Sequence, residues 1–332
     1  MISASDIVRL PYTPDLTEAG LIYARRVMPR LHSPSSRGLY EGVRRAAAAG
    51  SVQLALRRFL AAQGIPFGVQ AARPFSDPDQ YSVEIGGRRC ELKSFLISRQ
   101  TQIDGLAADP ALALTAPALV PMDRLVDERL RSDDLYLFAF VSAATAHTAA
   151  ATPRASSAVS GEFWLHALPA AWARPRTWVP LAPLALKSDA ADELQLTLAG
   201  EDGSGAPLDV DIRLPARQRV VVDAPLYALS HIHSLTHPAA RIGIHPPSHK
   251  TTYLISSMAW ENVWLWGKEI YLLGWISQAD FRLRATLIPE GRRVYQFERT
   301  KTKNLAVDVR SLRPIRQLLA RVREVPQRGS FP

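Results

Sequence analysis

The sequence predicts an α/β fold with a β-rich C-terminal part, and three observations support this prediction. A helix-forming stretch precedes a β-hairpin, and a run of apolar residues typical of a buried strand follows the hairpin. Beyond about residue 160, short strand-like segments alternate with turns that contain Gly or Pro. A chain of 332 residues is long enough for two domains, or for one core that carries a large insertion.

Two helices are expected before the hairpin. The first spans Thr13 to Met28, with Thr13 as its N-cap and Pro14 in the first helical position. The second spans residues 36–62, because Ser36 is a favourable N-cap, its composition is rich in Ala, Arg and Leu, and a glycine follows its end. Gly50 is a possible interruption of this second helix.

The hairpin is expected at residues 81–93. Tyr81 to Ile85 alternates as a strand does, the two glycines at 86–87 suit a two-residue turn with positive φ, and Arg88 to Lys93 returns. Side chains two apart on a strand point the same way, so Glu91 and Lys93 share one face. Cys90 and Leu92 are then expected to point to the opposite face.

These residues suit the hydrolysis of a phosphodiester. Asp79 lies just before the first strand, and Asp79 and Glu91 can hold Mg²⁺ through carboxylate oxygens, with the backbone carbonyl of Leu92 as a further ligand. Lys93 can position the attacking water, lower its pKa or pair with a phosphate oxygen. Asp77 is a rival for Asp79, which is preferred because it abuts the strand.

Pro78-Asp79 followed by Glu91-Leu92-Lys93 resembles the PD-(D/E)xK motif of the restriction-endonuclease-like nuclease superfamily. The resemblance covers residues 1–142 and implies a restriction-endonuclease-like core, in which a mixed central sheet is flanked by helices. It also implies a further glutamate on the helix that precedes the motif, and Glu41 fits that position. The catalytic set expected from the resemblance is therefore Asp79, Glu91, Lys93 and Glu41.

The rest of the chain is expected to extend the core and then to form a second module. A helix at Val126–Arg131 and a buried strand at Asp134–Val141 follow the hairpin, and residues 143–161 form a linker or exposed loop. Residues 162–332 are expected to form a β-rich basic module that is closed by a helix at Leu312–Val325. The strands expected in this module are Phe163–Leu168, Leu194–Leu198, Leu208–Leu214, Val220–Val222, Thr252–Ser256, Ile270–Trp275, Phe281–Ile288 and Val294–Phe297. Alternatively, residues 269–288 return to the first sheet. The region between the first core and residue 269 is then an insertion.

The positive charge is concentrated at the C-terminal end. From Phe281 onward, thirteen basic residues stand against four acidic ones, so this segment alone accounts for the net charge of +9. Concentrated arginine is typical of phosphate binding, although an Arg-rich surface can also reflect a GC-rich coding background. The residues predicted to contact nucleic acid are Arg292, Arg293, Arg299, Lys301, Lys303, Arg313 and Arg316.

Cysteine and histidine place further limits on the chemistry. Cys90 is the only cysteine, which excludes an intramolecular disulfide and a cysteine-based zinc cluster. Five histidines fall between His231 and His249, and His231 and His233 on a strand would face the same side, as a transition metal requires. A polar loop is the competing interpretation of this cluster.

The expected function is that of a Mg²⁺-dependent endonuclease on DNA, with Mn²⁺ as a substitute metal and RNA as an alternative substrate. Restriction or antiviral defence fits a nuclease that carries its own recognition module, and repair or recombination is also compatible. A homodimer or a partner protein is expected if both strands are cut. No signal peptide or membrane span is expected, so the prediction is a soluble, cytoplasmic protein. The alternative is a non-catalytic nucleic-acid-binding subunit, and a Cys- or His-based hydrolase is a third possibility.

Overall fold

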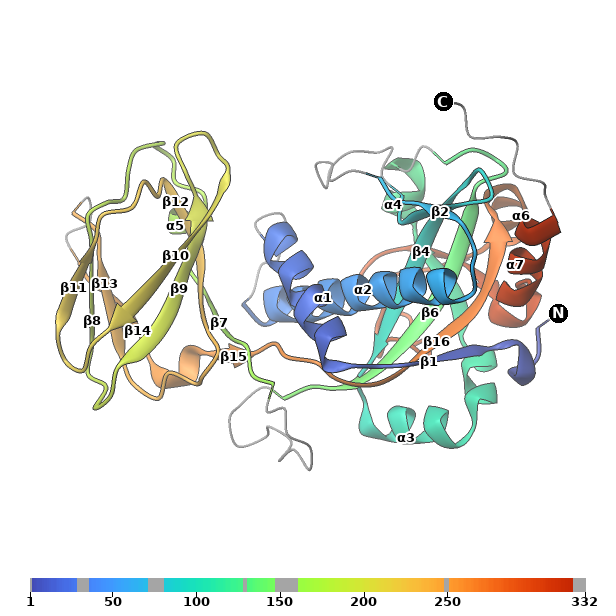
Figure 1. Cartoon of the computed structure of the whole chain (residues 1–332), viewed down its shortest axis with the longest axis horizontal. Coiled ribbons are helices and arrows are strands. Elements are labelled where there is room, and N and C mark those ends of the chain that lie inside the picture. The colour runs from blue at the N-terminus through green and yellow to red at the C-terminus, as the bar shows by residue number, and fades with distance from the viewer. Residues whose placement is uncertain are drawn as a thin grey trace. The chain divides into compact units, whose positions relative to one another are not determined.

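A mixed α/β unit and a second unit built mainly of β-strands make up the chain in the computed structural model (Figure 1). The structure describes residues 2–28, 36–70, 81–127, 130–146, 161–247 and 251–324. Unit 1 consists of Met1–Tyr23, Arg45–Ala144 and Trp266–Pro332, and unit 2 consists of Ala24–Arg44 and Thr145–Leu265. Unit 1 is therefore assembled from three stretches that are separated along the chain.

A curled six-stranded sheet forms the centre of unit 1, in the order β1-β16-β6-β4-β3-β2. Its strands are β1 (Val8–Pro11), β2 (Phe67–Gly68), β3 (Val83–Ile85), β4 (Arg88–Ile97), β6 (Leu135–Ala144) and β16 (Trp266–Ser277). β4 and β6 are parallel, and the other neighbouring strands are antiparallel. A parallel pair needs a crossover connection. It is supplied by α3 (Gln100–Ala108), a 3₁₀-helix (Pro110–Thr115), β5 (Pro117–Pro121) and α4 (Met122–Asp127).

The helix α2 (Ser36–Ala62) has the predicted bounds, and α1 (Pro14–Val27) lies within one residue of its prediction at each end. Gly50 does not interrupt α2. A Cβ on Gly50 would lie 3.1 Å from Gly20 Cα, so the two glycines let α1 and α2 approach closely. Gln53 Nε2 donates to the carbonyl of Ser82 at 3.1 Å, which ties α2 to the hairpin.

One face of the central sheet carries an aromatic core. Tyr136, Phe138 and Phe140 of β6 are almost fully buried there, with Phe281 of α6 (Gln278–Arg284) packed against the first two. A small antiparallel sheet of β17 (Thr286–Ile288), β18 (Asn304–Asp308) and β5 lies in the same unit. The last helix, α7 (Ile315–Glu324), packs beside β16.

Unit 2 contains a β-sandwich. One sheet has the order β10 (Pro207–Leu214), β9 (Leu194–Glu201), β12 (Ala228–Ser234), β7 (Trp164–Ala167), β15 (Glu261–Asn262). The other has the order β11 (Arg219–Val222), β8 (Leu184–Ser188), β13 (Ile242–His245), β14 (Tyr253–Ile255). Leu198 and Ile232 of the first sheet share a core with Leu186 and Ile244 of the second. A short helix, α5 (Ala170–Ala173), packs against β12.

The observed division of the chain differs from the expected module at 162–332. β16 pairs with β6 along its length, so the chain re-enters the first sheet at Trp266, as the insertion alternative required. Of the expected linker at 143–161, residues 147–160 lie outside the described residues. The physical reason for the return is that β6 is buried along nearly its whole length and needs a partner on both edges.

Three expected elements were wrong in type or extent. Residues 278–284 form helix α6 rather than the first part of a strand, and only 286–288 are extended in β17. Val294–Phe297 is a tight turn in which the amide of Val294 donates to the carbonyl of Phe297, and the amide of Phe297 donates back. Of the helix expected at Val126–Arg131, residues 126–127 belong to α4, residues 128–129 lie outside the described residues, and Leu130 and Arg131 are not helical.

Candidate active site

The hairpin that carries the motif has the predicted turn. Gly86 and Gly87 adopt φ values of +57° and +73°, a left-handed conformation that other residues rarely adopt. The pairing of Val83 with Cys90 fixes the register of the hairpin. Cys90 is fully buried on one face of β4, as predicted, and burial raises the pKa of its thiol to about 12, so it is not a nucleophile near neutral pH.

Glu91 and Lys93 lie together on the opposite face. Lys93 Nζ is 3.5 Å from Glu91 Oε1. The side chain of Lys93 is 11% exposed and that of Glu91 is 22% exposed. The ammonium group also lies 5.6 Å from the ring centroid of Tyr136 in the neighbouring strand. The face-sharing that the two-residue spacing predicts is confirmed, and the pair is reachable from solvent without being fully exposed.

Ser82 holds this pair in place, although sequence reasoning missed it. Its hydroxyl donates to Glu91 Oε2 at 3.1 Å and accepts from the backbone amide of Leu92 at 3.0 Å. Its carbonyl accepts from Gln53 and from Arg57, whose pKa is lowered by burial. The signal lay in the hairpin register, because counting back from the two-glycine turn places Ser82 opposite Glu91.

Of the two remaining expected catalytic residues, one is not described and the other belongs to unit 2. Asp79, like Asp77, lies outside the described residues. Glu41 lies in the part of α2 that belongs to unit 2, where it accepts from Arg44 at 3.2 Å. Arg44 is 1% exposed and also pairs with Glu261 at 2.6 Å, so Glu41 belongs to a structural ion-pair cluster in that unit.

The basic residues are mostly in one loop of unit 1. Residues 289–303 connect β17 to β18, and their cationic side chains Arg292, Arg293, Arg299, Lys301 and Lys303 are exposed. Hydrogen bonds within the loop order it. Thr300 Oγ1 donates to the carbonyl of Pro289 at 2.7 Å, and the amide of Gly291 donates to the carbonyl of Thr300 at 2.8 Å.

Aromatic contacts place this basic loop on the same face of the sheet as Glu91 and Lys93. Tyr295 stacks on Phe140 with ring centroids 5.9 Å apart, and Phe297 meets Phe95 edge-on, also at 5.9 Å. Phe95 is two residues beyond Lys93 on β4, so both side chains project from one face. The loop that carries the exposed cations therefore packs on the same face of the sheet as the candidate carboxylate and the lysine.

The two other residues predicted to contact nucleic acid lie outside this loop. Arg313 pairs with Asp280 at 2.9 Å, and its guanidinium lies 5.1 Å from the ring centroid of Trp275. Its charge is therefore partly neutralised within the fold. Arg316 is exposed on α7.

The histidine pair has a different character. His231 and His233 lie on β12 with ring centroids 5.8 Å apart, and both are buried. Burial lowers the pKa of His231 far below its ordinary value and lowers that of His233 to about 3. Within the described ranges, no three His, Cys, Asp or Glu residues are grouped as a metal site requires, and His249 falls outside those ranges.

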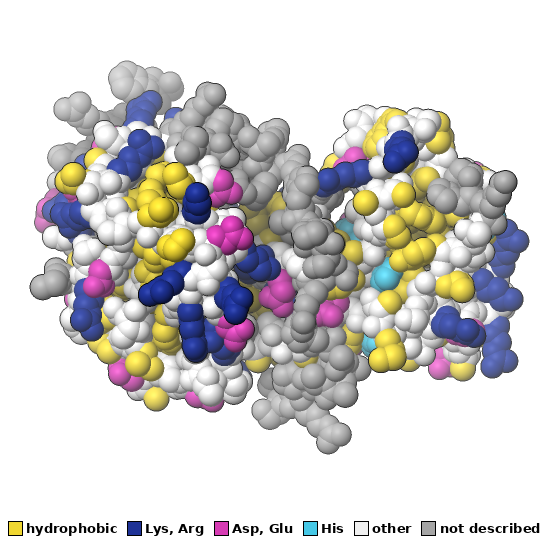
Figure 2. All heavy atoms as spheres, turned by 180° about the vertical axis from the view of Figure 1, so that it is seen from behind, with side chains coloured by type: hydrophobic (Ala, Val, Ile, Leu, Met, Phe, Trp, Pro, Cys, Tyr) yellow, Lys and Arg dark blue, Asp and Glu magenta, His cyan; other side chains and the backbone are white. Residues whose placement is uncertain are grey.

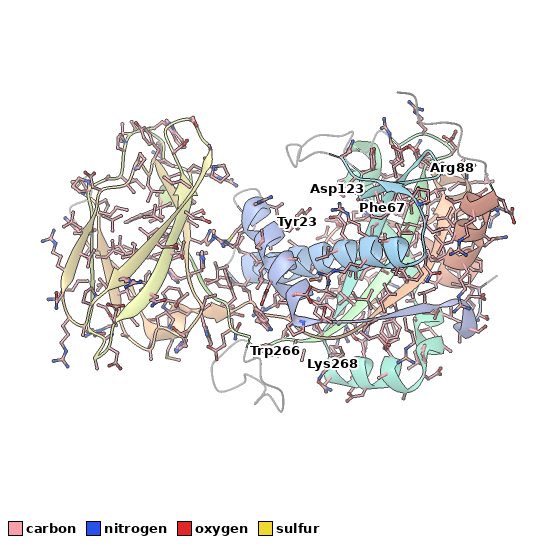
Figure 3. The ribbon with its side chains drawn as sticks, viewed as in Figure 1. Tyr23, Phe67, Arg88, Asp123, Trp266 and Lys268 are labelled. Carbon is pink, nitrogen blue, oxygen red and sulfur yellow. The ribbon has the colours of Figure 1, made fainter. Side chains whose placement is uncertain are left out.

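The labelled view in Figure 3 shows Phe67 and Arg88 near the hairpin end of the first unit and Trp266 at the start of the returning strand β16. Comparison with protein families, with curated proteins and with solved structures found no match to this chain. The fold defines a general class of protein. It is a mixed α/β unit in which a β-sandwich is inserted in the sequence between the sheet strands β6 and β16. None of the helices in the described part of the chain is long and apolar enough to cross a membrane.

Proposed function

We propose that this protein is a metal-dependent endonuclease that hydrolyses phosphodiester bonds in DNA, with a restriction-endonuclease-like core in unit 1. The observation that carries the proposal is the position of Glu91 and Lys93, side by side on one face of a mixed sheet that the loop at 289–303 borders with five exposed cations. A carboxylate, an ammonium group and a phosphate-binding surface together match the needs of phosphodiester hydrolysis.

The described donors suit Mg²⁺. Glu91 and the backbone carbonyl of Leu92 offer oxygen atoms, which are the ligands that hard cations prefer, and Asp79 would supply a second carboxylate. When bound there, the metal ion stabilises charge on the phosphate and increases the acidity of a water molecule. Glu91 is held by the neutral hydroxyl of Ser82, which orients the carboxylate without cancelling its charge.

The chain's own residues perform the other tasks. Lys93 lies close enough to Glu91 to hold a water molecule or a phosphate oxygen beside the carboxylate. Tyr136 and Phe95 give this face an apolar base, which strengthens the electrostatic interactions made above it. The loop at 289–303 binds the sugar-phosphate backbone and positions it over the pair.

Site-directed variants test the proposal. Wild-type protein, Glu91→Gln, Lys93→Ala and Asp79→Asn are incubated with plasmid, linear duplex, single-stranded DNA and RNA, in Mg²⁺, Mn²⁺ or EDTA. We expect metal-dependent cutting by the wild type and a loss of at least about 100-fold in each variant, because each removes a group that acts on the transition state. DNA binding, measured in EDTA, should change much less.

Glu84→Gln is the matched control. Glu84 is a carboxylate on the same hairpin, but it accepts a hydrogen bond from Tyr81 at 3.1 Å and lies outside the proposed set. It should cut at nearly the wild-type rate. If no protein cuts while all bind DNA in a salt-dependent manner, the non-catalytic binding subunit replaces the nuclease as the conclusion.

A further inference from the structure

The outer face of the second sheet in unit 2 has the features of a binding surface. In β8, Leu184 and Leu186 point into the core and are fully buried, whereas Lys187 points outward and is exposed. A hollow of about 750 Å³ lies on this outer side. Its described lining comes from β8, β11, β13, β14 and the turn before β11. Figure 2 shows Lys and Arg side chains gathered along the outer edge of the unit at right.

The hollow carries an excess of positive charge. Its described lining includes the four cations Lys187, Arg217, Arg219 and Arg241 and a single carboxylate, Asp189. Asp189 is committed to Arg241, because Arg241 Nε lies 2.9 Å from its Oδ2 and the backbone amide of Arg241 donates to its Oδ1 at 2.8 Å. No ion pair of the other three cations is found within the described part of the chain, so they can meet an anion from solution.

The strand register places two of these cations directly opposite each other. Lys187 pairs with Arg219 across the antiparallel strands β8 and β11, and like charges at opposed positions destabilise a sheet. Arg217 adds a second unfavourable feature, since it adopts φ +56° in a turn where Gly or Asn is usual. An anion bound between these side chains would turn the repulsion into an attraction.

The base of the hollow is open and apolar. Gly243 is the neighbour of Lys187 on the side away from Arg219, and a Cβ there would lie 3.1 Å from a side-chain atom of Thr252 and 3.4 Å from one of Leu254. Glycine thus keeps this part of the face clear. Leu254 is 66% exposed beside it. An extended ligand with charged and uncharged parts fits such a surface better than a small anion does.

We propose that this face of the inserted sandwich binds the phosphate backbone of nucleic acid without regard to sequence. The choice of nucleic acid among polyanions rests on the proposed nuclease function. Arginine forks suit phosphate oxygens, and Asn and Gln, which read base edges, are missing from the described lining of the hollow. The face is a second contact for the substrate, separate from the loop at 289–303 in unit 1.

The test measures binding in EDTA, where cleavage plays no part. Full-length protein with Lys187→Ala and Arg219→Ala is compared with the wild type for two labelled DNA duplexes of different sequence over a series of salt concentrations. We expect both duplexes to bind more weakly by the same factor, and the slope of log K against log salt to become shallower by about 2. The free energy of unfolding at low salt should be unchanged or slightly higher, because a repulsive pair is removed.

Arg176→Ala with Arg213→Ala is the control, since it removes the same charge from exposed positions of unit 2 outside the hollow. An equal change of slope in the two double variants would overturn the proposal, as would a loss of binding to phosphatidylserine vesicles with DNA binding intact. A failure of the nuclease proposal would appear instead as absent cleavage by the wild type in Mg²⁺. The two failures are therefore distinguishable.

Discussion

At the scale of single residues, Ser82 shows how one side chain organises the candidate site. One hydroxyl satisfies both a carboxylate oxygen of Glu91 and the amide of Leu92, and Ser82 itself is only 9% exposed. Truncating such a group leaves polar partners unpaired, and that cost exceeds the net value of the bond itself. The stability of the hairpin should therefore be sensitive to this serine.

We predict that Ser82→Ala lowers the free energy of unfolding by about 1–3 kcal/mol, because the amide of Leu92 loses its partner. Urea denaturation followed by circular dichroism measures the change. Ser94→Ala is the control in the same strand, since no hydrogen bond to its hydroxyl is found among the described residues, and it should cost less. Equal losses in both variants would show that the hydroxyl of Ser82 has no special role.

Part of the site could be predicted at this scale. Glu91 and Lys93 share a face because alternation in a strand is a local rule, and the left-handed turn follows from two adjacent glycines. Tyr136 beside Lys93 could not be predicted, because the parallel register of β4 and β6 depends on a crossover of several elements. The placement of the basic loop depends likewise on contacts made by Tyr295 and Phe297.

At the scale of elements, α6 shows how a local signal was misread. Residues 281–288 alternate between apolar and polar positions, which indicates a strand, but Ser277 caps a helix by accepting from the amide of Asp280 at 3.1 Å. Phe281 is then buried against Tyr136 and Phe138, so the helix is fixed by a long-range contact as well as by its cap. The helix α2 was predicted correctly because its N-cap, composition and terminal glycine agree.

The hairpin turn gives a prediction for this scale. Gly87 has φ +73°, and a Cβ there would meet no atom within 4 Å, so only the backbone conformation limits substitution. Gly87→Asn should be tolerated, because Asn adopts the left-handed region readily, whereas Gly87→Val should destabilise the protein by about 1–2 kcal/mol. Thermal unfolding of both variants measures the difference. A Val variant as stable as the Asn variant would contradict the left-handed turn.

At the scale of the whole molecule, the insertion explains what the sequence left open. Ala144 at the end of β6 pairs with Trp266 at the start of β16, so the chain leaves the sheet and returns to the adjacent position. The apolar run of β6 indicates a buried strand, but nothing local identifies its partner more than a hundred residues away. A β-rich module was predicted over residues 162–332, of which only the part up to Leu265 belongs to unit 2, and the return of the chain to the first sheet remained one of two alternatives.

The β-sandwich also makes the stability of the protein depend on pH. His231 and His233 are buried and neutral, because desolvation and the nearby Arg25 lower their pKa values, with Asp211 opposing this effect at His233. In the unfolded chain both titrate near pH 6.5, so below that pH the unfolded state binds more protons. Their contribution to stability is therefore fully present above pH 6.5 and decreases as the pH falls, and for His233 it is lost as the pH approaches about 3.

We predict that lowering the pH from 7.5 to 5 removes about 2 kcal/mol of stability through His233, since each pH unit below 6.5 costs about 1.4 kcal/mol per proton, and that His231 acts in the same direction. Urea denaturation at a series of pH values measures the loss. His231→Leu with His233→Leu is the control: it keeps the positions apolar and should make the free energy of unfolding much less dependent on pH in this range. Other titrating groups affect both proteins alike, so the difference between the two pH profiles isolates the pair. Parallel profiles would mean that the histidines are protonated as easily in the folded sandwich as in the unfolded chain.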